Sequence, residues 1–226
     1  MKIVVKIGGS VIASPLNPEL ILRYSEVLRS LKNERHELVV VVGGGKVARE
    51  FISVAQKMGL SDEDKDEIAI LVSRLNCQLL ARELREYSSR QIPSTVEEVR
   101  RLLVAGKIVV MGGLKPGITT DTVAALVLRS TGSKLMVKAT DQDGIFDKDP
   151  KKFADARKLD KLTYIDLYKT VTQETHTPGM HQILDLQSIQ ILESQKAKVI
   201  VVNGFDPNNI LLAAKGEKVG TIVDVK

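Results

Sequence analysis

Two runs of β-branched residues that end at glycines constrain the fold of this chain more than any other feature. Residues 2–10 read KIVVKIGGS, and residues 37–46 read ELVVVVGGGK. A run that is apolar on both faces is typical of a strand buried inside a parallel sheet. A third run of this kind, residues 109–120, reads VVMGGLKPGITT. We therefore predict three buried parallel strands with glycine-rich ends.

The glycines at these strand ends favour an anion site. Glycine lets backbone N–H groups approach an anion closely, and a helix that begins just beyond a strand adds the positive end of its dipole. We therefore expect the three strand ends to converge on phosphate groups. The backbone donors that we expect there are those of Gly8, Gly9, Ser10, Gly44, Gly45, Thr119 and Thr120.

Helical patterns alternate with strands along the whole chain. Apolar residues at helical spacing predict a short helix near Ile165 and longer ones over 18–32, 46–58, 64–87, 95–105, 120–130, 182–195 and 207–215. Further strands are expected at 135–139, 199–202 and 221–225. This alternation is typical of an α/β sheet with helices on both faces. No convincing linker divides residues 1–226, so we expect one domain, in which the parts before and after residue 140 each carry half of the site.

Composition narrows the class of protein. Of 226 residues, 43% are hydrophobic and 27% are charged, as in an ordinary globular protein. Aromatic residues make up only 4%, and no basic run is interleaved with them, which disfavours nucleic-acid binding. The net charge of +5 fits either a modest excess of surface lysine or a positive field that serves anionic substrates. One cysteine, Cys77, excludes an internal disulfide and is expected in the core.

The expected cellular setting also follows from the sequence. The chain opens on a strand rather than a signal peptide, and no apolar run reaches membrane-spanning length, so we expect a cytoplasmic protein without a membrane partner. The helix expected over 64–87 is apolar on several sides, with one stripe made by Ile68, Leu71, Val72, Leu75 and Leu79. Such a helix is either deeply buried or shared with a partner chain, and we expect a homo-oligomer.

Two nucleotide-binding motifs were compared with the second strand end. Gly43, Gly45 and Ala48 fit the dinucleotide pattern G-x-G-x-x-A, which favours an NAD-binding Rossmann enzyme as the alternative interpretation. That pattern also needs a carboxylate at the end of the next strand, and the acidic residues at the required spacing, 62–66, introduce a helix instead. A Walker A loop is excluded, because its first glycine and its Ser or Thr are replaced by Val40 and Val47.

Phosphoryl transfer explains more of the sequence. Its transition state spreads negative charge over the moving group, so the site needs fixed donors and cations more than a nucleophile. Lys6 lies two residues before Gly8 in an apolar run, which favours a central strand and a functional ammonium over a surface lysine on an edge strand. Asp121 opens a helix; it is either a residue favoured by the helix dipole or one that holds a catalytic lysine or a metal.

The remaining polar residues point less clearly to a site. The acidic residues of 141–149 lack the order of an EF-hand loop and fit a solvated turn as well as a functional loop. His176 and His181 have no partner histidine at metal-ligand spacing and are expected to be polar loop residues. We therefore predict no metal site built from side chains.

Four motifs in order are similar to those of a known family. They are residues 6–10 (KIGGS), 42–49 (VGGGKVAR), 111–121 (MGGLKPGITTD) and 140–150 (TDQDGIFDKDP). Together they resemble the amino-acid kinase family, and their order and spacing most resemble its archaeal-type uridylate (UMP) kinases. The resemblance covers essentially the whole chain.

The resemblance implies a fold and a reaction. The fold is a three-layer α/β/α sandwich around a mainly parallel sheet. The reaction is transfer of the γ-phosphoryl group of ATP to UMP, giving ADP and UDP, with Mg²⁺ carried by ATP, in pyrimidine nucleotide (CTP and UTP) biosynthesis and usually in a hexamer. The alternatives are a related kinase for isopentenyl phosphate, carbamate or another acylphosphate-forming substrate, or a non-catalytic nucleotide-binding relative. The absence of a histidine near Gly45 disfavours an isoprenoid acceptor.

The resemblance also implies roles for individual residues. Lys6 would stabilise the transferring group, and Asp121 would orient the lysine and the metal. The ATP-binding residues would be Gly8, Gly9, Ser10, Gly45, Arg49, Thr140, Asp141, Phe146 and Asp149. The UMP-binding residues would be Gly44, Asp66, Gly113, Leu114, Lys115, Pro116, Gly117, Ile118, Thr119 and Thr120.

The chain departs from the family pattern at one catalytic position. Many members carry a second catalytic lysine shortly after a Gly-Met pair, whereas Gly179-Met180 is followed here by His181 and Gln182. Either Lys6 acts with Mg²⁺ and backbone donors, or another cation such as Lys46 substitutes. Asp141 also stands where related uridylate kinases often have asparagine.

Overall fold

A seven-stranded sheet runs through the centre of the molecule, with β1 between β2 and β4. The structure is a computed structural model that describes residues 1–172 and 183–225. Neighbouring strands are parallel except β8 and β9. In spatial order the strands are β3 (Val109–Met111), β2 (Glu37–Val42), β1 (Lys2–Ile7), β4 (Leu135–Thr140), β8 (Lys198–Asn203), β9 (Thr221–Asp224) and β7 (Lys161–Thr163).

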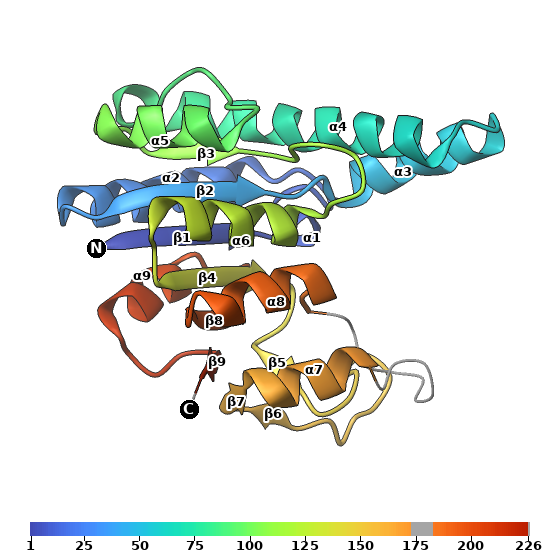
Figure 1. Cartoon of the computed structure of the whole chain (residues 1–226), viewed down its shortest axis with the longest axis vertical. Coiled ribbons are helices and arrows are strands. Elements are labelled where there is room, and N and C mark those ends of the chain that lie inside the picture. Colours follow the sequence, from blue (N-terminus) through green and yellow to red (C-terminus); the bar gives the residue numbers. More distant parts are fainter. Residues whose placement is uncertain (173–182, 226) are drawn as a thin grey trace.

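Helices cover both faces of this sheet and complete three layers (Figure 1). One face is covered by α2 (Pro18–Asn33), α4 (Asp62–Glu83) and α9 (Asn208–Lys215). The other is covered by α5 (Val96–Val104), α6 (Thr120–Thr131), α7 (Tyr164–Thr172) and α8 (Leu186–Ser194). The remaining elements are α1 (Gly9–Ile12), α3 (Gly45–Lys57), a 3₁₀ turn (Arg85–Tyr87) and the antiparallel pair β5 (Ile145–Phe146) and β6 (Lys158–Leu159).

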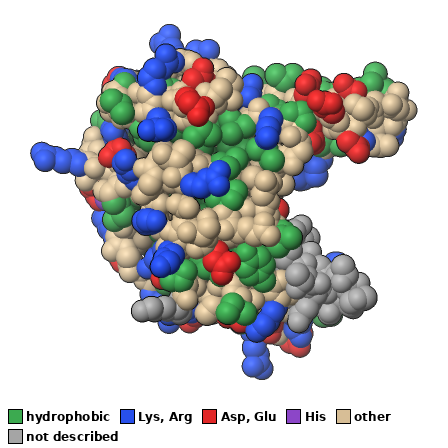
Figure 2. All heavy atoms as spheres, in the orientation of Figure 1, with side chains coloured by type: hydrophobic (Ala, Val, Ile, Leu, Met, Phe, Trp, Pro, Cys, Tyr) green, Lys and Arg blue, Asp and Glu red, His purple; other side chains and the backbone are tan. Residues whose placement is uncertain are grey.

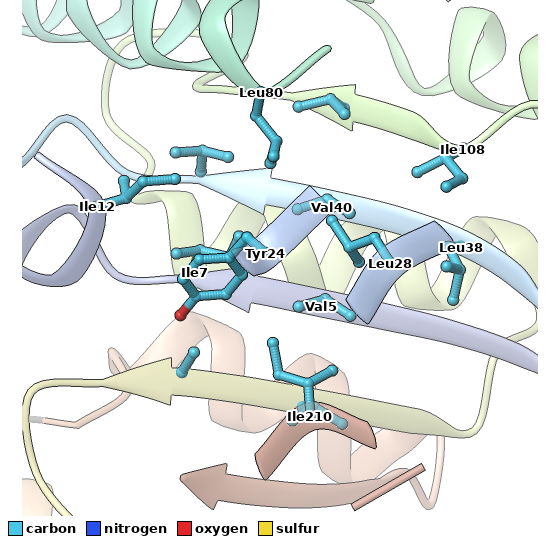
Figure 3. Close-up of a cluster of buried hydrophobic side chains, with 14 of the residues drawn as sticks. Val5, Ile7, Ile12, Tyr24, Leu28, Leu38, Val40, Leu80, Ile108 and Ile210 are labelled. Atoms are coloured by element: carbon cyan, nitrogen blue, oxygen red, sulfur yellow. The ribbon is translucent and has the colours of Figure 1, made fainter. Parts of the chain in front are cut away.

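The buried strands divide their side chains between two cores. In β2, Leu38 and Val40 pack into the core beneath α2 and α4, while Val39 and Val41 pack into the core beneath α6. This is the two-residue alternation of a strand with both faces covered. Figure 3 shows the first core, where Tyr24 of α2 lies beside Ile7 of β1. A continuous apolar run is therefore used on both faces, as the sequence predicts.

Local signals place most of the helix boundaries. Asn17 caps α2 by accepting the amide of Leu20 at 3.2 Å, and Ser61 caps α4 in a reciprocal capping box with Asp64. Thr95 followed three residues later by Glu98 is the sequence pattern of a second capping box, at the start of α5. Thr95 does accept the amide of Glu98, but the Glu98 carboxylate accepts the amide of Ser94 instead, so only half of that box forms.

Several elements differ from those expected. No strand was predicted between residues 139 and 199, yet this part contains β7, which joins the sheet beside β9, and the pair β5 and β6. The helix expected over 182–195 begins at Leu186 with Asp185 as its cap, and Gln182 lies outside the described residues. Cys77 is fully buried, as expected. None of the helices in the described part of the chain has the length and hydrophobicity needed to cross a membrane.

Helices α3 and α4 extend past the sheet together at the end where β1 and β2 finish (Figure 1). Figure 2 shows the molecule hollowed on this side, below the arm that these helices form. The glycine-rich strand ends predicted from the sequence open onto this side.

Candidate active site

Three cavities lie along the carboxyl ends of β1, β2 and β4. The first cavity has a volume of about 520 Å³ and is lined by Lys6, Gly8, Gly9, Ser10, Gly43, Gly44, Gly45, Arg49, Thr120, Asp121, Lys138, Thr140, Asp141, Gln142, Lys151 and Ile183. The second, of about 630 Å³, is lined by Gly44, Gly45, Ala48, Arg49, Asp66, Ala69, Ile70, Ser73, Gly113, Lys115, Gly117, Ile118, Thr119 and Thr120. The third, of about 210 Å³, is lined by Asp141, Gln142, Asp143, Phe146, Pro150, Lys151 and Asn203.

These cavities adjoin one another. Gly44, Gly45, Arg49 and Thr120 line both the first and the second cavity. Asp141, Gln142 and Lys151 line both the first and the third. Most of the residues predicted for the site are therefore brought together, along one continuous hollow with the first cavity in its middle.

The floor between the first two cavities is built from backbone. A Cβ on Gly9 would lie 2.0 Å from the nitrogen of Gly45, and Gly45 itself has φ +69°, so neither position tolerates a side chain. The loops after β1 and β2 can touch only because both are glycine. One expected donor is already used, since the Gly8 amide donates to the carbonyl of Ala139 at 2.8 Å and extends the β1–β4 ladder. The amides of Gly9 and Ser10 lie in the first turn of α1, where they have no acceptor within the helix.

Two buried lysines and one aspartate meet beside this floor. Lys6 and Lys138 are partners in the β1–β4 register, and both residues are almost completely buried. Oδ1 of Asp121, at the start of α6, lies 3.6 Å from Lys6 Nζ and 2.5 Å from Lys138 Nζ. Lys6 therefore lies on a central strand, as its apolar neighbours indicate. Lys138 was not singled out, although it too is a lone lysine in an apolar run.

The charges of this cluster shift one another. Burial raises the pKa of the Asp121 carboxyl, but Lys138 and Lys6 together outweigh burial and hold that pKa below its usual range. Burial is the main cause that lowers the pKa of Lys138 to about 8; the Asp121 charge opposes this shift and the Lys6 charge adds to it. The Asp121 carboxylate is therefore ionised at neutral pH and paired with two cations.

Asp185 fixes the start of α6 from another part of the chain. Its carboxylate accepts the hydroxyls of Thr119 at 2.6 Å and Thr122 at 2.8 Å, and it caps α8 by accepting the Ser188 amide at 2.9 Å. Thr119 in turn caps α6 by accepting the amide of Asp121. Asp185 was missed by the sequence analysis, because its contacts on α6 are more than 60 residues away in sequence.

Helix α4 shapes the second cavity. Asp66 accepts the amide of Gly117 at 2.7 Å, and the guanidinium of Arg74 donates to the carbonyls of Gly113 and Leu114 at 3.1 and 3.3 Å. Asn76, also on α4, donates to the carbonyl of Gly43 at 3.0 Å. These bonds hold the loops after β2 and β3 at a fixed separation.

Some predicted binding residues lie beside the cavities rather than in their walls. Leu114 packs against the core beneath α6, and neither it nor Pro116 lines the second cavity. Asp149 is 2% exposed and accepts the amide of Lys151 at 2.9 Å, so it shapes the loop below the third cavity without lining it. Asp141, by contrast, lines two cavities and pairs with the ammonium of Lys151 at 2.6 Å.

The lysine that the structure places beside Lys6 is not Lys46, the alternative cation considered from the sequence. Lys46 is 67% exposed at its side chain, pairs with Glu50 at 3.8 Å and lines none of the three cavities. The lysine that joins Lys6 at Asp121 is Lys138. Residues 179–182, near which the family resemblance implies a second lysine, lie outside the described residues, as do His176 and His181.

The parallel sheet presents backbone amides and two lysines to this hollow, an arrangement typical of phosphoryl-transfer enzymes such as kinases. The chain belongs to the amino acid kinase family, whose sequence profile matches residues 1–203. The uridylate kinase of Methanocaldococcus jannaschii is 39% identical over 226 residues, which cover 99% of this chain and 100% of that protein. The uridylate kinase of Methanobrevibacter smithii is 36% identical over 223 residues, 99% of each chain. The crystal structure of the uridylate kinase from Archaeoglobus fulgidus superposes with a TM-score of 0.89 at 36% identity, covering 99% of this chain and 100% of that one.

Proposed function

We propose that this chain is a UMP kinase that transfers the γ-phosphoryl group of ATP to UMP, giving ADP and UDP, in pyrimidine nucleotide synthesis. The observation that carries this proposal is the pair of adjoining cavities that share Gly44, Gly45, Arg49 and Thr120, with Lys6 in the wall of the first. Two phosphate chains entering from opposite sides would meet there. The names of the relatives support the choice of UMP as acceptor.

Each of the three cavities is assigned to one part of the two substrates. ATP would place its phosphates in the first cavity, against the amides of Gly9 and Ser10, and its base in the third, beside Phe146. UMP would occupy the second cavity, with its ribose at Asp66 and its phosphate at Thr119 and Thr120. The acceptor then lies mainly on residues 1 to about 140 and ATP partly on the later ones, within one domain whose sheet spans both halves.

The residues present fit a Mg²⁺ ion that is carried by ATP. In the described part of the chain, no group of three or more His, Cys, Asp or Glu residues is arranged to hold a metal. Asp121, an acid that lines the first cavity, already shares Oδ1 between two ammonium groups. When bound, Mg²⁺ would neutralise charge on the phosphates. The protein would contribute the lysines and the backbone donors.

Replacing Asp66 with alanine is expected to raise the KM for UMP by about tenfold and leave the KM for ATP nearly unchanged. A hydrogen bond to a charged group contributes about 1.5–3 kcal/mol, and this carboxylate also holds the Gly117 amide of the acceptor loop. Steady-state kinetics with each substrate varied in turn measure both constants. Glu63→Ala, on the exposed first turn of the same helix, is the matched control. An unchanged KM for UMP in Asp66→Ala would contradict the assignment.

We also propose that the chain assembles with copies of itself through α4. Leu71, Leu75 and Leu79 form a stripe four residues apart along this helix and are 65%, 64% and 42% exposed. On the neighbouring α3, Phe51, Val54 and Met58 are exposed by more than half. Figure 2 shows hydrophobic side chains among the acidic ones on this arm. Exposed apolar side chains gathered on two neighbouring helices are typical of a protein–protein interface.

Replacing Leu75 with glutamate should therefore reduce the assembly to smaller species, because a carboxylate would be buried at the interface without a partner. Sedimentation velocity at micromolar concentration measures the change. Ile165→Glu is the matched control, because it changes an equally exposed apolar residue on α7. It should leave the mass of the assembly unchanged. If the unmodified chain already sediments as a monomer, the assembly proposal is wrong.

The direct test of the proposed function is an acceptor panel. The protein is mixed with ATP, Mg²⁺ and one of UMP, CMP, dUMP, AMP, carbamate or isopentenyl phosphate, and the formation of ADP is followed. We expect UMP to give the highest kcat/KM. Turnover with isopentenyl phosphate or carbamate but not UMP would assign the chain to another branch of the family, and no turnover with any acceptor would favour a non-catalytic relative.

A further inference from the structure

We propose that Lys138 is the second cation of the reaction and donates hydrogen bonds to the phosphoryl group as it moves from ATP to UMP. This inference rests on the proposed function. In that reaction an oxygen of the UMP phosphate forms a bond to the γ-phosphorus. The bond from this phosphorus to the oxygen that it shares with the β-phosphate breaks, and its electron pair leaves with ADP. Lys138 forms no covalent bond and keeps its protons; it stabilises negative charge on the transferring oxygens.

Lys138 reaches the same point as Lys6 from the neighbouring strand. The two residues are register partners on β1 and β4, which run side by side at about 4.8 Å, so their side chains point to the same face of the sheet. Both ammonium groups are directed to Oδ1 of Asp121, and both side chains line the first cavity. An ammonium has three protons. Asp121 accepts one from Lys138, which leaves others for a phosphate in the cavity.

A lysine at position 138 lowers the stability of this buried strand. Its neighbours Val137 and Ala139 are fully buried, and Met136 packs on the same face. A buried ammonium costs free energy unless it is paired, and like charges directly opposite on adjacent strands are destabilising. An apolar residue here would leave Asp121 paired with Lys6 alone. The packing of the sheet therefore does not explain Lys138, and a functional role does.

Among the residues that the structure describes, this cluster holds two ammonium groups and only one carboxylate within ion-pair distance, so a second anion in contact would complete the pairing. Lys6 and Lys138 share one carboxylate oxygen. Asp185 also acts on Lys138 through its charge, but its carboxylate lies beyond ion-pair distance of Lys138 and is hydrogen-bonded to the hydroxyls of Thr119 and Thr122. The open side of the cluster is the first cavity. A transferring phosphoryl group placed there carries the complementary charge, and a fixed cation stabilises it most where that charge is spread.

Three variants test this role. Lys138→Met removes the charge at similar length, and Lys138→Gln removes the charge but keeps a donor for Asp121, which provides a second route if the methionine variant does not fold. Lys46→Met removes the exposed lysine of α3 and serves as the matched control. For each, kcat and both KM values are measured, together with the affinity for ADP plus UMP in the presence and absence of aluminium fluoride, which mimics the transferring group.

We expect Lys138→Met and Lys138→Gln to lower kcat by about 10²-fold or more, with both KM values within about threefold of those of the unmodified chain. The affinity gained on adding aluminium fluoride should fall by a similar factor, whereas a lysine that only supports the fold would not change that gain. Lys46→Met should retain normal turnover. A kcat within threefold of normal in either Lys138 variant, or an unchanged aluminium fluoride effect, would overturn the inference and leave the proposed function intact. If the unmodified chain does not phosphorylate UMP, the proposed function and the role inferred for Lys138 are both wrong.

Discussion

Lys6→Ala is expected to lower kcat by about two to four orders of magnitude while nucleotide binding stays measurable. Lys6 lies on the central strand, with its ammonium 3.6 Å from Asp121 and its side chain in the wall of the first cavity. A fixed cation at this point acts mainly on charge that develops during transfer, and removing one such donor typically costs about 10²–10³ in kcat. A lysine that also neutralises a buried acid is expected to cost more.

The measurement is single-turnover formation of UDP, with ATP and UMP affinities determined by calorimetry on the same preparation. Lys2→Ala is the matched control, because Lys2 lies on the same strand but is 44% exposed at its side chain and pairs with Glu37 at 3.9 Å. It should have normal turnover. Near-normal turnover in Lys6→Ala would remove the main residue of the proposed mechanism.

Asp121→Ala is expected to lower the free energy of unfolding by about 3–5 kcal/mol, which is the usual cost of leaving a buried charge without its partner. Here two ammonium groups, on β1 and β4, lose the oxygen that they share. Activity should be lost as well, because the lysines would separate to reduce their repulsion. Urea denaturation followed by circular dichroism measures the change in stability.

A double variant separates the charge effect from a loss of packing. In a Lys138→Met background, Asp121→Ala leaves only one unpaired ammonium, so its cost in stability should be smaller than in the native background. Asp62→Ala, at an exposed acid that pairs with Lys65 at 2.6 Å, should change stability little. If Asp121→Ala lowers the free energy of unfolding equally in both backgrounds, Asp121 does not stabilise Lys138, and this account of the cluster is wrong.

The sequence predicted the parts of the fold that are encoded locally. Runs such as ELVVVV are apolar on both faces, and both faces are covered; the glycines that follow β1 and β2 are required where the two loops touch. Helix caps such as Asn17 and Ser61 act within three residues, so a local sequence pattern carries this kind of signal as well. Lys6 was predicted to be functional because a single charged residue in a buried strand needs either an ion-pair partner or a role in the site.

The parts that were missed depend on contacts between distant segments. Lys138 carries the same local signal as Lys6, but its importance follows from the β1–β4 register, which brings together residues 132 positions apart. Arg74 and Asn76 look like ordinary polar residues of a helix, and only the fold brings them to carbonyls of the glycine loops more than 30 residues away. The short strand β7 was missed because three residues give too little alternation to recognise.

The central claim is that two nucleotides meet, phosphate to phosphate, over the glycine floor between the first and second cavities. Its most direct test is a crystal structure with UMP and a non-hydrolysable ATP analogue. We predict the γ-phosphate within hydrogen-bond distance of Lys6 Nζ, in the first cavity above the touching Gly9 and Gly45 backbones, with the UMP phosphate beside Thr120. If the two nucleotides bind on separate surfaces, or if Ser10 and Thr120 have no ligand between them, the account is wrong.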